Sequence, residues 1–177
     1  MQFDYAPDYK YYQSDVTRVF PANGTFTPRQ RELYTIYLRL YQALMTSIKV
    51  HAAPRDIIRD AARKMDAILA SYPFTDARDQ VGGDSASSTA TAAAPGTASA
   101  TRVGMEVHDV SGPAPTLEPG MIFTIEPALQ IPEEHIGVRL EDMILITDTG
   151  YENLSEFVPD RDRRHRADDA RARFQKR

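Results

Sequence analysis

The sequence predicts an α/β protein, in the sense of separate helices and antiparallel strands (α+β). Two observations support this class. Residues 3–12 and 15–20 are rich in aromatic and β-branched side chains, as strands are, whereas residues 28–48 repeat apolar side chains at helical spacing. The chain has 177 residues, of which 42% are hydrophobic, and this is enough for one core. We therefore expect a single domain.

The first half of the chain predicts two strands followed by two helices. Residues 21–24 (PANG) form a turn after the strands. Thr27 then begins a capping-box pattern with Pro28 at the first helical position. The apolar face of this helix comprises Leu33, Ile36, Tyr37, Leu40, Leu44 and Ile48. A second helix is expected from Pro54 to residues 71–73, with Ile57, Ile58, Ala61, Met65, Ile68 and Leu69 on one face.

The second half contains two further strands between segments without a core pattern. Residues 77–102 are mostly Ala, Ser and Thr and include no run of large apolar side chains, so we interpret them as a low-complexity insert. Residues 121–131 and 136–147 predict strands, and Gly150 predicts a turn after the second. Residues 159–177 are charged and lack a periodic apolar face, which is typical of a tail.

Composition narrows the function classes. A net charge of -4 gives no reason to expect nucleic acid or an anionic membrane as partner. No apolar run reaches the ~20 residues of a membrane span, and the N-terminus does not resemble a signal peptide, so we expect a cytoplasmic protein. There is no cysteine, so any metal must be held by Asp, Glu and the four histidines. The chain also begins inside a predicted strand, as a fragment would.

Four carboxylates lie on predicted strand faces. In the run VRLED, alternation directs Glu141 away from the apolar side chains, and the same holds for Glu126 in FTIEP. Asp4 and Asp15 can meet on one face of the first hairpin. Converging carboxylates repel one another unless cations neutralise them, and oxygen ligands favour hard divalent ions such as Mn²⁺ or Mg²⁺. The set predicts a two-metal site that activates a water for attack on a carbonyl.

Each of these residues has a simpler interpretation when it is taken alone. A single Asp near a strand end is usually a cap or turn residue, and a single Glu in a strand usually faces water. His108 alone would more often be a packed, hydrogen-bonded imidazole. His51 and His135 are interpreted as surface residues, the second with the alternative of a pocket rim. Only the complete set supports a metal site.

Four runs, in this order, resemble the pita-bread metallopeptidases: DYAPDYKYYQSDVTR, VGMEVHDV, LEPGMIFTIEP and GVRLED. The resemblance is strongest to Xaa-Pro aminopeptidase (aminopeptidase P) and prolidase. It implies that residues 1–158 form part of a pita-bread catalytic domain, a curved antiparallel sheet backed by helices with the metal site in its concavity. It also implies that the first helical repeat and any N-terminal domain are missing before Met1.

The resemblance assigns roles to individual residues. Glu126 would also handle protons for the nucleophilic water, His108 would bind substrate and steady the tetrahedral intermediate, and Arg139 would lie beside the site. The implied cofactors are two divalent ions, Mn²⁺ first, with Co²⁺ or Zn²⁺ as alternatives. A fifth ligand, a histidine seven positions before His108, is replaced here by Thr101. The implied metal ligands are Asp4, Asp15, Glu126 and Glu141.

Residues 97–101 (TASAT) suggest why that histidine is missing. The expected run HGLGH, written CAC GGC CTC GGC CAC and read one base late, translates as TASAT. The tail gives a second case. Codons for PIEIADIE, a typical continuation in this family, translate as PDRDRRHR when they are shifted by one inserted base, and this is the sequence of residues 159–166. We therefore interpret the insert and the tail as frame-shifted coding sequence. The simpler alternative is a natural linker and a basic tail.

The resemblance implies a metal-dependent aminopeptidase that releases the N-terminal residue from peptides with proline in second position. Because one ligand is absent, we expect impaired activity for this chain. Family members are often homo-oligomeric, and neither nucleic acid nor membrane is expected as partner. Two alternatives stay open: a catalytically dead pita-bread module that binds peptides or proteins, and another enzyme of the group, a prolidase (Xaa-Pro dipeptidase) or a methionine aminopeptidase.

Overall fold

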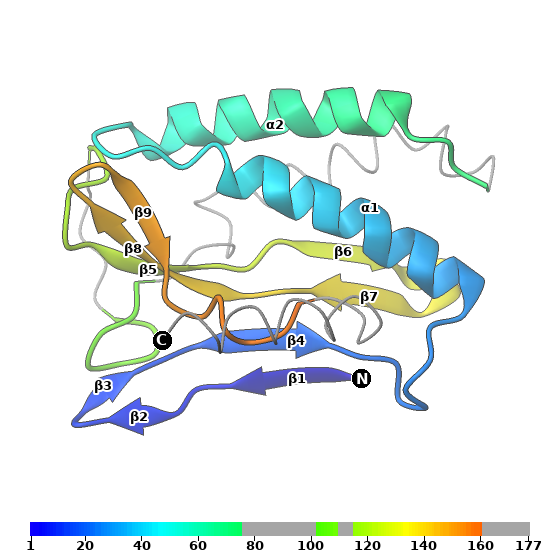
Figure 1. The fold of residues 1–177 in the computed structure, drawn as a ribbon, viewed down its shortest axis with the longest axis horizontal. Helices are drawn as coiled ribbons and strands as arrows, with labels where there is room; N and C mark the ends of the chain where they lie inside the picture. Colours follow the sequence, from blue (N-terminus) through cyan, green and yellow to red (C-terminus); the bar gives the residue numbers. More distant parts are fainter. Residues whose placement is uncertain (76–101, 110–114, 161–177) are drawn as a thin grey trace, which may run out of the picture.

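The computed structural model describes residues 1–75, 102–109 and 115–160. Nearly all of the predicted insert and tail lies outside these ranges, and so does Thr101. The described part contains helices and antiparallel strands, so the predicted class is confirmed (Figure 1). None of its helices is both long and apolar enough to cross a membrane.

The N-terminal residues form two short antiparallel ladders. Strand β1 (Gln2–Tyr5) pairs with β4 (Val16–Val19), and β2 (Asp8–Tyr9) pairs with β3 (Tyr12–Gln13). The prediction of one strand over residues 3–12 is therefore wrong in its extent. The chain reverses at Lys10 and Tyr11, whose φ angles are 53° and 70°. Non-glycine residues rarely adopt this left-handed region. Because neither residue is a glycine, the sequence does not indicate a turn at this point.

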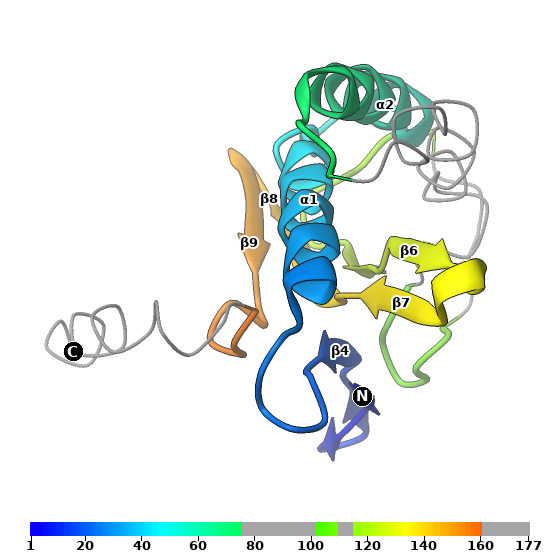
Figure 2. The same cartoon turned by 90° about the vertical axis from the view of Figure 1, so that its right-hand side faces the viewer.

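Both predicted helices are confirmed. Helix α1 spans Pro28–Met45 and α2 spans Pro54–Ser71. The capping box of α1 is formed as expected: the Thr27 hydroxyl accepts from the Gln30 amide at 3.2 Å, and the Gln30 side chain accepts from the Thr27 amide at 3.0 Å. Helix α1 lies between α2 and β4 in both views (Figures 1 and 2).

The C-terminal half forms two sheets, in which β8 pairs with β5 and β9 and β6 pairs with β7, all antiparallel. Both long predicted strands are interrupted, the first after Ile125 and the second after Arg139. Gly150 follows a two-residue turn and begins a strand that was not predicted. The elements are β5 (Ile122–Ile125), β6 (Ala128–Ile131), the 3-10 turn η1 (Pro132–Glu134), β7 (Ile136–Arg139), β8 (Asp142–Thr147) and β9 (Gly150–Asn153).

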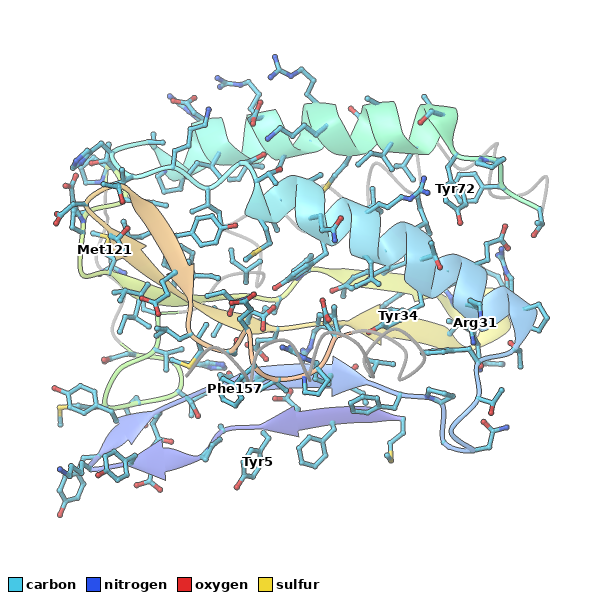
Figure 3. The ribbon with its side chains drawn as sticks, viewed as in Figure 1. Tyr5, Arg31, Tyr34, Tyr72, Met121 and Phe157 are labelled. Carbon is cyan, nitrogen blue, oxygen red and sulfur yellow. The ribbon has the colours of Figure 1, made fainter. Side chains whose placement is uncertain are left out.

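The core forms where α1 meets these strands. Its most deeply buried apolar side chains are Ile36, Leu140, Ile144 and Ile146. Val138 and Leu140 belong to the core, whereas the alternate side chains Arg139 and Glu141 point to the opposite face, as alternation predicts. In Figure 3, Tyr34 lies on the strand side of α1. This packing fixes the strands whose other face bears the carboxylates.

Candidate metal centre

Three predicted residues converge on one point. Asp4 from β1, Asp15 just before β4 and Glu141 between β7 and β8 each offer a carboxylate oxygen, and these oxygens lie within 4.8 Å of one another. Asp4 is exposed at the edge of the cluster, whereas Asp15 and Glu141 are only 6% and 1% exposed. The structure therefore brings together acidic side chains from both halves of the chain.

Glu126 and Arg139 complete the surroundings of this cluster. The Arg139 guanidinium donates to an Asp4 carboxylate oxygen and to the Thr17 hydroxyl, the latter at 3.1 Å. Its other terminal nitrogen lies 3.6 Å from the Glu126 carboxylate, which is 12% exposed. Glu126 thus borders the cluster through the arginine, although it is not one of the three residues within ligand distance of one another.

The electrostatics of the cluster show how closely the negative charges are packed. Burial raises the pKa of Glu141 to about 7. The negative charges of Glu126, Asp15 and Asp4 act in the same direction. Burial also raises the pKa of Asp15, followed by the charges of Asp4 and Glu126. The group is under electrostatic strain that a bound cation would relieve.

Thr17 is a site residue that the sequence reasoning missed. It is fully buried, and its hydroxyl donates to Glu141 Oε2 at 2.7 Å. Alternation contained the signal, because Thr17 lies two residues after Asp15 and therefore on the same strand face. The main chain adds a bond from the Glu141 amide to the Thr17 carbonyl at 3.0 Å. Together these bonds hold Glu141 against β4.

The residues present fit a divalent cation. Glu141 Oε1 is buried and has no hydrogen-bond partner among the described residues, which is costly for a carboxylate oxygen in the interior. It belongs to the same side chain that meets Asp4 and Asp15. An all-oxygen donor set is the kind that Mg²⁺ and Mn²⁺ prefer. The unpartnered oxygen therefore has the chemistry of a metal ligand.

His108 is not one of the residues of the carboxylate cluster. It is exposed on a turn within residues 102–109 and forms no hydrogen bond or ion pair with the described residues. The segment itself is anchored, since Gly104 accepts from the Gln13 amide at 2.8 Å and Arg102 bridges to Phe123. The family resemblance implied that His108 binds substrate, and this role stays a prediction.

The profile of metallopeptidase family M24 matches residues 1–148. The chain belongs to this family. It is 36% identical to Xaa-Pro aminopeptidase 2 of Streptomyces coelicolor over 166 residues, which cover 84% of this chain and 34% of that protein. It is 34% identical to Xaa-Pro aminopeptidase of Escherichia coli, covering 85% of this chain and 36% of that protein. The chain thus spans about a third of the length of these M24 relatives.

Solved aminopeptidase P structures show the same fold. Proline aminopeptidase P II from Yersinia pestis superposes with a TM-score of 0.71 at 32% identity, covering 94% of this chain and 40% of that one. Zinc-substituted aminopeptidase P of Escherichia coli in complex with product gives 0.67 at 31% identity, covering 90% and 38%. The predicted pita-bread fold is confirmed, in the partial form that this chain covers.

Proposed function

We propose that this chain contains the metal centre of an Xaa-Pro aminopeptidase, an enzyme that releases the N-terminal residue from peptides with proline in second position. The observation that supports this most directly is the buried, unpartnered Glu141 oxygen inside a cluster of carboxylates. Membership of family M24 and the names of the relatives support the reaction class.

Asp4, Asp15, Glu126 and Glu141 would hold two divalent ions, with Mn²⁺ as the first candidate. Such ions would supply Lewis acidity and lower the pKa of a water bound at the site. Glu126, at the border of the cluster, would accept a proton from the attacking water at a carboxylate oxygen. Arg139 keeps Glu126 and Asp4 oriented through its guanidinium. His108 would bind the substrate carbonyl.

One specific observation favours a second candidate, a peptide-binding module without hydrolytic activity. Thr101 stands where the resemblance implies a histidine ligand, and the Arg139 guanidinium already places a positive charge against two of the four carboxylates. The missing histidine is also why we expect impaired activity if this chain is an enzyme. Loss of a residue that supports a metal ligand already costs about 10–100-fold in metal affinity or activity.

Peptide hydrolysis tests the two candidates against each other. The chain is incubated with Mn²⁺ and matched peptides that carry proline or alanine in second position. We expect slow release of the N-terminal residue from the proline peptide and none from the alanine peptide. A chelator and Glu126→Gln should each abolish this release. Peptide binding without any release would favour the binding module. Cleavage of the Xaa-Pro dipeptide alone would indicate a prolidase instead.

A further inference from the structure

Glu126 and Glu141 lie at the only interruption of what is otherwise one continuous ladder in the described strands β5 to β8. Ile125 pairs with Asp142 at the end of β5 and β8, and Ala128 pairs with Arg139 at the start of β6 and β7. Two residues separate these pairs on each strand. The register is therefore the same on both sides, and Glu126 falls directly opposite Glu141 within the break.

The break is filled by a side chain from helix α1. The Tyr37 hydroxyl donates to the Pro127 carbonyl at 2.7 Å and accepts from the Leu140 amide at 2.7 Å. In the continued register Pro127 and Leu140 are the other opposed pair of the break. The phenol oxygen thus takes the place of a main-chain hydrogen bond that would otherwise join these two residues.

Tyr37 is suited to this position. Its side chain is only 2% exposed and packs in the apolar core, with its ring 6.4 Å from that of Tyr34 and 6.2 Å from that of Tyr41. Burial raises the pKa of its hydroxyl, so the group stays a hydrogen-bond donor throughout the physiological pH range. Both of its main-chain partners are buried polar groups that would be costly to leave unpaired.

We propose that Tyr37 is a positioning residue for the metal centre: its hydroxyl, inserted between Pro127 and Leu140, sets the separation of Glu126 and Glu141. Side chains directly opposite each other in an unbroken antiparallel pair lie ~4.5–5.5 Å apart at Cβ. A hydroxyl inserted next to that pair holds the strands further apart. The two carboxylates are then spaced to take cations between them. This inference rests on the proposed metal centre.

Tyr34 offers a matched control for the test. It lies three residues before Tyr37 on the same helix, is also buried, and its hydroxyl donates to the main-chain carbonyl of Asp160, away from the break. Tyr37→Phe and Tyr34→Phe therefore remove the same atom from the same helix. Only the first removes it from the strands that bear the glutamates.

The experiment measures Mn²⁺ affinity by titration of the whole chain and of both variants, each checked for folding by circular dichroism. We expect Tyr37→Phe to weaken Mn²⁺ binding by about 10–100-fold, the effect typical of lost support around metal ligands, and Tyr34→Phe to leave it unchanged. Unchanged affinity in Tyr37→Phe, or equal losses in the two variants, would overturn the inference.

Amide hydrogen exchange without metal gives a second, independent measurement. We expect Tyr37→Phe to accelerate exchange at Leu140, whose amide loses its acceptor, and Tyr34→Phe to leave that amide unaffected. The Glu141 amide donates to the Thr17 carbonyl and should keep its exchange rate in both variants. Equal exchange rates at Leu140 in the unsubstituted chain and Tyr37→Phe would overturn the inference. If the unsubstituted chain takes up no Mn²⁺, the proposed function fails, and this exchange measurement still decides whether Tyr37 bridges the break.

Discussion

The buried hydroxyl of Thr17 holds two residues of the candidate metal centre in place. It donates to one oxygen of Glu141 and accepts from Arg139, so it contacts both the acidic and the basic part of the site. Thr17→Val keeps the shape and removes the donor. We expect the pKa of Glu141 to rise further and Mn²⁺ affinity to fall by about 10-fold or more.

A titration with Mn²⁺ checks this expectation. Thr35→Val is a suitable control, because the Thr35 hydroxyl donates to the Arg31 carbonyl on the exposed side of α1. The control should bind Mn²⁺ like the unsubstituted chain. Equal affinity in Thr17→Val and the unsubstituted chain would show that the Thr17 hydroxyl does not support the centre.

The raised pKa of Glu141 predicts a pH dependence with a definite sign. Its value of about 7 lies above the ordinary 4.5, so in the metal-free chain this group contributes stability below about pH 4.5 that is lost as pH rises through about 7. Metal binding needs the ionised form. Mn²⁺ affinity should therefore increase from about pH 6 to about pH 8, with proton release.

Calorimetric titrations in buffers of different ionisation enthalpy measure both quantities. The free energy of unfolding of the metal-free chain, measured with urea over the same pH range, should fall as pH rises. In Glu141→Gln this pH dependence should be weaker, because the titrating group is removed. An affinity for Mn²⁺ that does not change between about pH 6 and about pH 8 would contradict the prediction.

Much of the site could be predicted at the residue scale, and the reason is strand alternation. Two-residue periodicity directs Glu141 and Arg139 to one face without any knowledge of the fold. Contacts between distant segments are different. That Tyr37 reaches Pro127 and Leu140 depends on how α1 packs on the strands, and no local pattern records this.

Helices and strands differed in how well the sequence defined their ends. Pro28 and Pro54 each begin a helix. Proline suits the first helical turn and disfavours a helical conformation in the residue before it, so the helix start is well defined by the sequence. The strand interruptions after Ile125 and Arg139 were not predicted. They arise where a side chain from another element replaces a ladder hydrogen bond, so the alternation of apolar and polar residues continues through them unchanged.

A buried ion pair joins β4, β8 and the C-terminal described residues. Arg18 contacts Asp142 at 2.6 Å, and it also donates to the main-chain carbonyls of Glu141 at 2.6 Å and Val158 at 3.1 Å. Arg18 holds the pKa of Asp142 below its ordinary value despite burial. Both side chains are no more than 5% exposed, so their separation would leave an uncompensated charge in the interior.

Arg18→Met should therefore destabilise the chain by about 3–5 kcal/mol, enough to unfold a domain of marginal stability. Replacing both partners, as in Arg18→Met with Asp142→Leu, should recover only part of the loss. It removes the uncompensated charge of the pair, but it leaves the buried Tyr41 and Ser155 hydroxyls without their carboxylate acceptor. Urea unfolding of the metal-free chain measures both effects. A single variant as stable as the unsubstituted chain would contradict this account of the pair.

At the scale of the whole molecule, we propose that residues 77–102 and the residues after Val158 derive from frame-shifted coding sequence. The motifs of this family stop and resume on either side of the first segment. Sequencing the source DNA across both segments tests the proposal. We expect another frame to read HGLGH or HSLGH before Val103 and PIEIADIE after Val158. If no frame contains these motifs, Thr101 is the native residue, and the binding module becomes the better interpretation.

The central claim, that this chain contains an M24 metal centre built around Glu141, is tested most directly by Mn²⁺ titration at about pH 8. The comparison is between the unsubstituted chain, Glu141→Gln, and Glu152→Gln as an exposed control on β9. We predict saturable, stoichiometric uptake that is lost in Glu141→Gln and retained in Glu152→Gln. Equal uptake in Glu141→Gln, or no saturable uptake by the unsubstituted chain, would contradict the claim.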